Sequence, residues 1–469
     1  MTRHDYVRPD ARLHLNLFQP FGPVYEWHRT PRPEDYYEFE QYARLVRTAE
    51  RGLFTAVFLG ESLRLREHLG RLNDIAVTGR PDALVLFSYL AARTSRIGFV
   101  ATLNTTYSDP VELARRLATV DLLSGGRAGW NVVTTHNAWT GENFRRGGYL
   151  DKADRYANAE EYVAAVQAIW DSFEPDAIAA DPSAPSWLDP DAGPRVVRRG
   201  RFHDVDTVPS VPRSPQGQPV YFQAGDSDEG RDFAARRAEG VFTHRIEHHD
   251  GVAFTADLRS RARRYGRPGD DITVFPGASL VVAETDAEAQ DKARHYRDHR
   301  LSDRRIRQVV ESVWGRDLTD ELDVDGDLPA TGPSVPEQTV ANGVVNSADD
   351  PVRTAERWRD LAAARGLTVR GLVHHLTAGP QFVGSPATVA DQLAHLVRSD
   401  AFDGLNVAPD AFPDGLDDVV DLLVPALQDR GVYPEEYPGT TLRENLGLPE
   451  SVGRRVPELA LLDGARSTR

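Results

Sequence analysis

Short runs of apolar residues alternate along most of the chain with longer segments in which apolar residues recur about every 3.6 positions. Eight of the short runs are typical of buried β-strands, and they lie at residues 13–18, 55–59, 96–101, 127–133, 219–225, 240–244, 273–282 and 404–409. Helix-length segments such as 35–52 and 109–126 lie between most of them. Strand and helix in alternation predict a parallel sheet, and about eight repeats favour a closed (β/α)8 TIM barrel over an open sheet.

Two stretches interrupt this alternation. Residues 174–218 are rich in Pro, Asp and Gly, and we expect an irregular excursion with a short hairpin near 199–205. Residues 295–370 contain a charged helical pattern followed by an acidic, Pro-rich segment. A long insertion of this kind in a compact domain is usually either a lid or disordered. We therefore expect one barrel domain over residues 1–469, with insertions at about 174–218 and 295–370, the second a candidate lid.

Composition narrows the class of protein. The net charge is −16, which argues against nucleic acid as a partner because phosphate neutralisation requires clustered Lys and Arg. The chain has no Cys and a single Met, so disulfides and thiolate metal sites are excluded. No apolar run approaches the roughly 18 residues of a membrane span, and the first residues lack the apolar core of a secretion signal. We expect a cytoplasmic protein with no membrane partner.

The fourth expected strand leads directly into a polar cluster. The cluster contains Asn131, Thr134, Thr135, His136 and Asn137. Because the functional face of a TIM barrel is built at the carboxyl ends of its strands, these side chains are expected at the mouth of a site.

The segment 221–242 reads as a strand, a glycine turn and a helix, with Ser227 placed to cap the helix. The free N–H groups and the positive dipole end of such a helix suit a phosphate. In the alternative interpretation, Ser227 and the two acidic residues after it simply cap the helix. Asp226 and those two acids would repel a phosphate unless they point outward or Arg231 compensates their charge.

Other motifs are weaker. The histidines of "HRIEHHD" (244–250), like His374 and His375, lack the helical His-x-x-x-His spacing with Glu of a zinc protease, and a solvated loop is the simpler interpretation. A serine nucleophile elbow would need Gly where Glu229 stands. The chain contains neither G-x-G-x-x-G nor a Walker loop, so nothing in it indicates a pyridine nucleotide site.

Five ordered segments together resemble the nitrilotriacetate, dibenzothiophene sulfone and pristinamycin monooxygenase family, within the bacterial luciferase-like flavin monooxygenases. These segments are 81–135, which ends in "GWNVVTT", 153–173, 211–242 with "YFQAGDSDEG", 384–393 and 403–448. They cover most of the chain outside 295–370. Agreement of this length and order is specific to the family, although no single segment would be.

The resemblance implies a luciferase-like TIM barrel that takes reduced FMN (FMNH2) from a separate NAD(P)H:flavin reductase. It also implies that O2 adds to the flavin to give a C4a-peroxide, which transfers one oxygen atom to a small organic substrate while the other leaves as water. Such a species must be kept from water, so an apolar pocket and a closing lid are expected. A homo-oligomer, either a dimer or a dimer of dimers, is the expected assembly.

The resemblance also assigns residues to the cofactor. Its flavin contacts fall on Thr102, Asn131, Tyr156 and Ser227. Three further positions depart from the family pattern but remain cofactor-binding candidates: Glu61 where Asp is usual, Lys152 where His is common, and Asp226 where Ser is usual. Taken alone, Thr102 and Asn131 could satisfy buried backbone groups, and Tyr156 could be half-buried helix surface.

Candidates for acid–base catalysis or substrate contact are His14, at the end of the first strand, and His136, at the end of the fourth, because imidazole titrates near neutral pH. Either could instead be an ordinary hydrogen-bonding residue. Trp27, Trp130 and Trp139 could wall an apolar ligand, although buried Trp more often serves packing.

Three alternatives remain open on the sequence alone. A deazaflavin-dependent oxidoreductase of the same superfamily would consume no O2. A metal-dependent hydrolase on a TIM barrel would depend on the histidines of 244–250 and would be sensitive to chelators. A non-catalytic flavin-binding protein would bind FMN and leave O2 uptake unchanged. The substrate is not fixed, since specificity is set by loops on a shared scaffold.

Overall fold

The structure is a computed structural model. It describes residues 8–18, 38–60, 63–73, 81–135, 138–141, 143–144, 152–174, 177–178, 182–183, 186–188, 194–334, 340–341, 344–345, 350–377, 381–409 and 413–449.

Eight parallel strands close into a barrel in the order β1, β16, β11, β10, β9, β6, β5, β2. The strands are β1 (His14–Phe18), β2 (Ala56–Leu59), β5 (Gly98–Asn104), β6 (Ala128–Val133), β9 (Val220–Gln223), β10 (Gly240–Thr243), β11 (Thr273–Ala278) and β16 (Gly404–Val407). Each lies within or overlaps one of the eight apolar runs of the sequence. The predicted TIM barrel is therefore confirmed, and its strands follow chain order around the ring.

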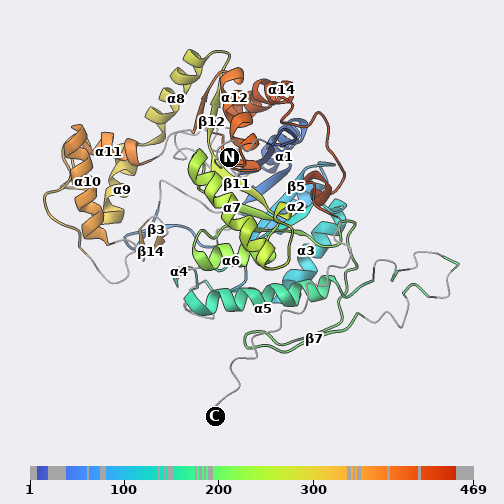
Figure 1. Ribbon diagram of the computed structural model, residues 1–469. Helices are drawn as coiled ribbons and strands as arrows, with labels where there is room; N and C mark the ends of the chain where they lie inside the picture. The colour runs from blue at the N-terminus through green and yellow to red at the C-terminus, as the bar shows by residue number, and fades with distance from the viewer. Residues whose placement is uncertain are drawn as a thin grey trace, which may run out of the picture.

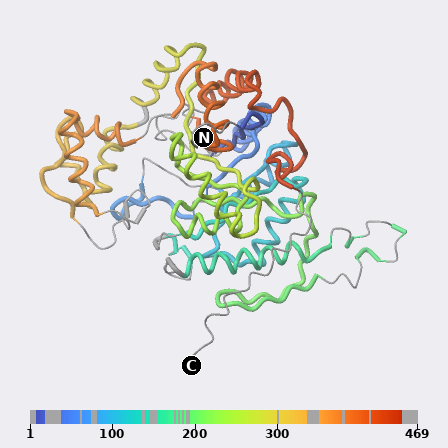
Figure 2. Tube along the Cα trace, in the orientation of Figure 1, coloured from blue at the N-terminus to red at the C-terminus, as the bar shows by residue number. Residues whose placement is uncertain are grey.

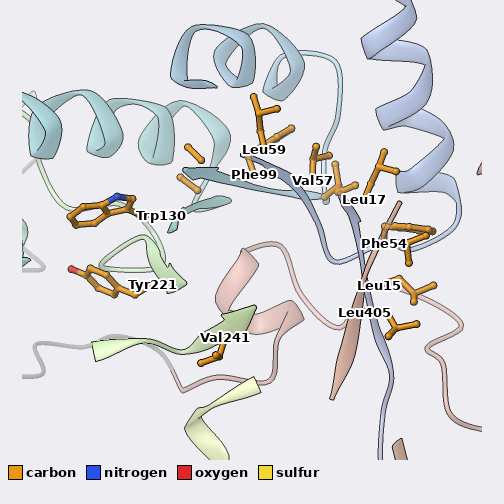
Figure 3. Packing of buried hydrophobic residues seen from close by; sticks show 14 of the residues in the cluster. Leu15, Leu17, Phe54, Val57, Leu59, Phe99, Trp130, Tyr221, Val241 and Leu405 are labelled. Atoms are coloured by element: carbon orange, nitrogen blue, oxygen red, sulfur yellow. The ribbon is translucent and has the colours of Figure 1, made fainter. Parts of the chain in front are cut away.

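Helices cover the outside of the barrel. They are α1 (Phe39–Arg51), α2 (Ala83–Ala91), α3 (Pro110–Ser124), α4 (Ala138–Gly141), α5 (Lys152–Trp170), α6 (Asp228–Arg237), α7 (His248–Arg264), α12 (Pro386–Arg398), α13 (Asp414–Asp418), a π-helical turn (Val419–Leu423) and α14 (Val424–Asp429). Outward-facing strand residues such as Leu17, Val57 and Phe99 pack beneath the helices (Figure 3). The boundaries of α3 follow its sequence, because Asp109 caps its first turn and Gly125 ends it in the left-handed conformation.

The amino end of the barrel is closed by the C-terminal segment with α15 (Leu442–Asn445). Leu442 and Leu446 pack against the inward-facing strand residues Val100 and Val220. A short 3-10 turn (Gly269–Asp271) precedes β11 on the same side. The barrel is thus sealed at this end by apolar side chains, and its other end is the open one.

The first insertion contains the antiparallel hairpin β7 (Val196–Arg198) and β8 (Val205–Thr207), as the sequence predicted. The loop between the two strands is bound to α5, because the Glu161 carboxylate accepts hydrogen bonds from the backbone N–H groups of residues 201–203. Figure 2 shows the described parts of this insertion reaching away from the barrel beyond α5.

The second insertion forms a helical lobe beside the barrel (Figures 1 and 2). It consists of α8 (Asp286–Arg300), α9 (Asp303–Trp314), α10 (Pro351–Arg365) and α11 (Val369–Leu376), with the short strands β13 (Val340–Ala341) and β14 (Val344–Val345). At its base, β12 (Leu280–Val282) pairs with β15 (Phe382–Gly384). Ile306, Val310, Trp314 and Val373 belong to an apolar cluster of its own.

The lobe contacts the loop that follows β2. This loop carries the hairpin β3 (Glu67–His68) and β4 (Arg71–Leu72). The buried His68 Nε2 lies 2.7 Å from Glu311 Oε2 on α9. Because the loop leaves the carboxyl end of β2, the lobe is attached on the open side of the barrel. No helix in the described part of the chain is both long and apolar enough to cross a membrane.

Candidate functional site

Inward-facing side chains near the carboxyl ends of the strands line the upper part of the barrel. The strand registers bring Phe58, Asn131, Phe242 and Asn406 to one level, and Phe18, Thr102, Ala224 and Gly277 to the next level toward the mouth. Stacked layers drawn from alternate strands are the usual filling of a TIM barrel. Here the layers divide into a polar half, from the carboxyl ends of β5, β6 and β9, and an aromatic half, contributed by β1, β2 and β10.

The polar half begins with Thr102 and Asn131, two of the residues that the sequence named as candidates for binding the cofactor. Asn131 Nδ2 donates a 2.9 Å hydrogen bond to Thr102 Oγ1, and both residues are buried. This bond fixes the orientation of the amide. Asn131 Oδ1 is buried but has no hydrogen-bond partner within the described part of the chain. An unsatisfied buried acceptor costs about 1–3 kcal/mol, so this oxygen is a candidate acceptor for a donor on a bound group.

The turn between β9 and α6 brings Tyr156 into the same half. A Cβ added to Gly225 would lie 3.0 Å from Tyr156 Oη, and one added to Gly230 would lie 2.9 Å from it. Because either contact is too short for a larger residue, the two glycines let the hydroxyl of α5 approach the first turn of α6. The tyrosine hydroxyl and a helix N-terminus thus converge, which is an arrangement that suits an anion.

Ser227 is the N-cap of α6, since its Oγ accepts a 3.1 Å hydrogen bond from the Gly230 N–H. The capping interpretation of the sequence is therefore correct. It does not remove the residue from the site, because a hydroxyl that accepts one hydrogen bond still carries a proton to donate. Ser227 is exposed, so that proton is accessible.

Asp226 is neutralised by a residue that the sequence did not single out. Arg245, two residues after β10, donates from Nε (3.1 Å) and Nη2 (3.0 Å) to Asp226 Oδ2. Arg231, the partner considered from the sequence, has its Nε 4.0 Å from Asp226 Oδ1, and it also donates to the Asp226 carbonyl oxygen and to the Asp257 carboxylate. The acidic side chain beside the candidate phosphate site therefore lies in an ion pair, which reduces its repulsion of an anion.

The aromatic half was not anticipated as a unit. Ring centroids lie 5.7 Å apart for Phe18 and Phe58, 5.4 Å for Phe18 and Phe242, and 6.2 Å for Phe58 and Phe242. Phe58 is buried, whereas Phe18 and Phe242 are half-buried at the mouth. The signal was present in the sequence, since side chains alternate faces along a strand and these phenylalanines occupy inward positions. Their clustering depends on strands far apart in the chain.

His14 does not lie at the mouth. It is the first residue of β1, so it lies at the amino end of the strand, and the prediction that it ends the strand is wrong. Its Nδ1 is 3.2 Å from Thr55 Oγ1, and its ring faces Phe275. Burial lowers the pKa of His14 to about 4, so the imidazole is neutral at pH 7. The barrel places it at the opposite end from the polar half.

Trp130 also points away from the mouth, which contradicts its predicted role as a wall. The inward position in β6 belongs to Asn131, so its neighbour faces the helices. The Trp130 indole packs beside Tyr221 at 5.9 Å between centroids (Figure 3), and its Nε1 donates to the Leu103 carbonyl oxygen. Its role is core packing.

Glu61, His136 and Trp27 lie outside the described residues, as do the side chains of Lys152 and Trp139, whose backbones belong to α5 and α4.

The histidines of residues 244–250 do not lie together in one cluster. His248 begins α7 and stacks on His395, with centroids 5.3 Å apart, and the exposed His249 lies near Asp250. His374 and His375 lie in the last turn of α11 in the lobe. Within the described ranges, no three His, Cys, Asp or Glu side chains are placed to share a metal ion.

Known proteins resemble this chain over most of its length. The model of the luciferase-like monooxygenase family matches residues 20–404. Nitrilotriacetate monooxygenase component A of Aminobacter aminovorans is 36% identical over 445 residues, with 92% of this chain and 95% of that protein covered. A dibenzothiophene-sulfone monooxygenase of Rhodococcus erythropolis (strain XP) is 32% identical over 464 residues, covering 96% and 98% respectively.

A solved structure agrees with the fold. Riboflavin lyase, crystallised with modified FMN and its substrate riboflavin, superposes with a TM-score of 0.77 at 27% identity, covering 95% of this chain and 98% of that one. Family model, relatives and barrel therefore agree, and this chain is a flavin-dependent monooxygenase that belongs to the luciferase-like monooxygenase family.

Proposed function

We propose that this chain is the oxygenase component of a two-component monooxygenase. It binds reduced FMN in the polar half of the mouth, uses O2 as co-substrate and oxygenates a small organic molecule. The flavin arrives reduced from a separate NAD(P)H:flavin reductase. The observation that carries the proposal is the buried, oriented and unpartnered Asn131 Oδ1.

The residues present fit FMN at both of its ends. The ring system of a flavin carries N–H donors and carbonyl acceptors at its edge, so Asn131 Oδ1 supplies the acceptor that a ring N–H needs. The Tyr156 hydroxyl, the Ser227 hydroxyl and the first turn of α6 suit the phosphate. Lys152, Glu61 and Asp226 are further candidates by position. When bound in its reduced form, FMN supplies the electrons that activate O2.

The chain's own residues have three tasks in this function. Asn131 holds the ring edge, and Thr102 keeps the Asn131 amide in one orientation. Phe18, Phe58 and Phe242 keep the space beside the ring dry. Exclusion of water strengthens polar interactions at the site and suppresses wasteful side reactions.

The helical lobe would act as the lid of the site. It is joined to the loop after β2 through His68 and Glu311, on the side where the barrel is open. Lid motions of this kind commonly close an active site over bound substrate. The whole chain, residues 1–469, would then act as one domain with the lobe as its moving part. His136, which follows β6, is the remaining candidate for proton transfer.

The proposal is tested by binding of reduced FMN under anaerobic conditions, followed by mixing with O2. We expect Asn131→Ala to weaken binding of reduced FMN by about 10- to 100-fold, the loss of one hydrogen bond to a buried group. Asn143→Ala, a change at an exposed asparagine, serves as the matched control.

The outcomes separate the alternatives. If reduced FMN shows no measurable binding and is oxidised by O2 as fast with the protein present as it is free in buffer, the proposal fails. A protein that binds a reduced deazaflavin tightly and consumes no O2 would be an oxidoreductase of the other type. Activity lost to a chelator would indicate a hydrolase, and FMN binding without O2 uptake for any substrate would indicate a flavin-binding protein.

A further inference from the structure

The two halves of the mouth differ in chemistry, and this difference bears on the substrate. The strands that carry the polar half, β5, β6 and β9, are neighbours in the barrel, and β10, β11, β16, β1 and β2 complete the ring. The polar half therefore faces the aromatic half across the mouth. A cofactor held by Asn131 and Tyr156 would leave the aromatic half to the second ligand.

Phe18, Phe58 and Phe242 of this half form an apolar surface beside the buried, hydrogen-bonded amides of Asn16 (β1) and Asn406 (β16). Phe18 and Phe242 stack with an interplanar angle of 26°, and Phe58 lies edge-on to Phe222 at 85°. Gly277 in β11 leaves room for the Phe242 ring, since a Cβ there would be 3.2 Å from Phe242 Cζ. The half-exposed faces of Phe18 and Phe242 are the part of this surface that a ligand can reach.

His244 stands at the rim of the aromatic half. It follows Phe242 by two residues and therefore points to the same face of the chain. Its ring lies edge-on to Phe242, 5.2 Å between centroids at 88°, and is exposed. The turn is held by two hydrogen bonds, Arg245 N–H to Thr243 Oγ1 and Ile246 N–H to the His244 carbonyl oxygen.

Among the described residues of this rim, the cation beside His244 already lies in an ion pair. Arg245, the cationic neighbour of His244, donates both of its short hydrogen bonds to Asp226. A ligand with several carboxylates needs cationic partners when it leaves water, because unpaired buried charge is strongly unfavourable. An apolar ring needs only a surface of matching shape, and offset or edge-to-face contacts with Phe favour it by about 0.5–1.5 kcal/mol per pair.

We propose that the aromatic half binds a planar, ring-containing and largely apolar substrate, and that His244 hydrogen-bonds a polar substituent at its edge. This rests on the proposed function for the identity of the opposite half. The site thereby selects against polycarboxylates such as the compound named in nitrilotriacetate monooxygenase, and in favour of compounds of the type named in dibenzothiophene-sulfone monooxygenase. His244 and Phe242 are the specificity-determining residues.

The test measures binding rather than turnover, by equilibrium dialysis of the full-length protein saturated with oxidised FMN. The probes are dibenzothiophene sulfone, its parent dibenzothiophene, which lacks the two sulfone oxygens, and nitrilotriacetate. We expect the sulfone to bind at least tenfold more tightly than nitrilotriacetate. Phe242→Leu, which keeps an apolar side chain but removes the ring, lowers the affinity for both aromatic probes by about three- to tenfold.

His244→Ala supplies the sharper readout. It reduces the preference for the sulfone over its parent by about fivefold, the loss of one hydrogen bond, and leaves the affinity for the parent nearly unchanged. His249→Ala is the matched control, because its imidazole belongs to the same sequence cluster and is 88% exposed. FMN affinity, measured in each variant, reports whether the polar half is intact.

Tighter binding of nitrilotriacetate than of the sulfone would overturn this inference, and so would unchanged sulfone affinity in both Phe242→Leu and His244→Ala. In either case normal FMN binding leaves the proposed function standing. If FMN itself fails to bind to the wild-type protein, the proposed function fails instead. The two failures are therefore distinct.

Discussion

The two ends of the barrel use polar residues in opposite ways. At the amino end, Glu239 binds Arg443 through two hydrogen bonds of 2.5 and 3.1 Å, so that a buried acid and a buried base satisfy each other. At the carboxyl end, Asn131 is held by Thr102 but keeps one buried oxygen without a partner. The amino end pairs its charged groups within the chain, although Arg443 Nε has no hydrogen-bond partner in the described part of the chain, and the carboxyl end leaves an oriented amide oxygen for a ligand.

The difference shows how one fold separates stability from chemistry. Asp121 continues the pattern at the amino end, accepting hydrogen bonds from Ser214, from Gln216 and from the Ala128 N–H. These partners come from the start of β6 and from the segment before β9, so the network joins the strands where the C-terminal segment closes the barrel. Substitutions at this end should change the free energy of unfolding, and substitutions at the mouth should change the affinity for FMN.

The largest effect is expected from Arg443→Ala. The substitution leaves the Glu239 carboxylate buried and without its partner, which typically destabilises a protein by about 3–5 kcal/mol. We expect the variant to unfold at a much lower denaturant concentration than the wild type. The protein that remains folded should bind FMN with normal affinity. Glu239→Gln in the same chain should restore part of the stability because it removes the stranded charge. A loss of FMN affinity equal to that of Asn131→Ala would contradict the conclusion that the amino end determines stability and the carboxyl end determines binding.

Asp121→Asn should change how stability depends on pH. Burial raises the pKa of Asp121 from 3.8 to about 6, so between these values the folded chain binds a proton that the unfolded chain does not. The stability of the wild type therefore falls as pH rises through this window, by about 2–3 kcal/mol in total. Asparagine can keep the same partners, accepting from Ala128 and Gln216 and donating to Ser214.

The measurement is the difference in unfolding free energy between Asp121→Asn and the wild type from pH 4 to pH 7. We expect this difference to grow with pH in favour of the variant and to level off above pH 6. The difference is needed because His14, whose pKa burial lowers from 6.5 to about 4, acts in the opposite sense and stabilises the fold as pH rises from 4 to 6.5. A constant difference would mean that Asp121 does not titrate in this range.

Thr102→Val tests the carboxyl end with a nearly isosteric change. It removes the acceptor of Asn131 Nδ2, so the amide loses its fixed orientation and gains a second unpartnered atom. We expect reduced FMN to bind about tenfold more weakly, equivalent to about 1.4 kcal/mol. Thr102→Ser, which keeps the hydroxyl, should recover most of the affinity. Equal losses in Val and Ser variants would show that packing, rather than the hydrogen bond, is what matters.

The sequence predicted the barrel because each strand is a local apolar run, and the alternation of strands and helices leaves few topologies. The ordered resemblance to a family named Asn131, Tyr156 and Ser227 as cofactor-binding residues, and these stay predictions. The prediction for His14 was wrong because this residue begins β1 and so lies at the amino end of the strand. The prediction for Trp130 was wrong because neighbouring residues of a strand face opposite sides, and Asn131 occupies the inward position.

Other features could not be predicted from local pattern. The pairing of Arg245 with Asp226 joins two loops that the closure of the barrel brings together. The aromatic half likewise depends on strand order, because Phe242 is more than 180 positions from Phe58 in the chain and yet lies beside it. To predict a site formed by residues far apart in the sequence, the register of the strands must be known as well as their positions.

The smallest effect, and the finest test of the comparison, is expected from Asp226→Asn. The change removes a half-exposed carboxylate beside the candidate phosphate site and frees Arg245 from its ion pair. Because exposed pairs contribute about 0.2–1 kcal/mol, FMN should bind about two- to threefold more tightly at low salt. The gain should vanish near 1 M salt, where the Debye length falls to about 3 Å. Lumiflavin, which has the flavin ring but no phosphate, should bind both proteins equally. An equal gain in affinity for lumiflavin would show that Asp226 acts on the flavin ring rather than on the phosphate. The assignment of the ring to Asn131 and of the phosphate to the turn before α6 would then be wrong.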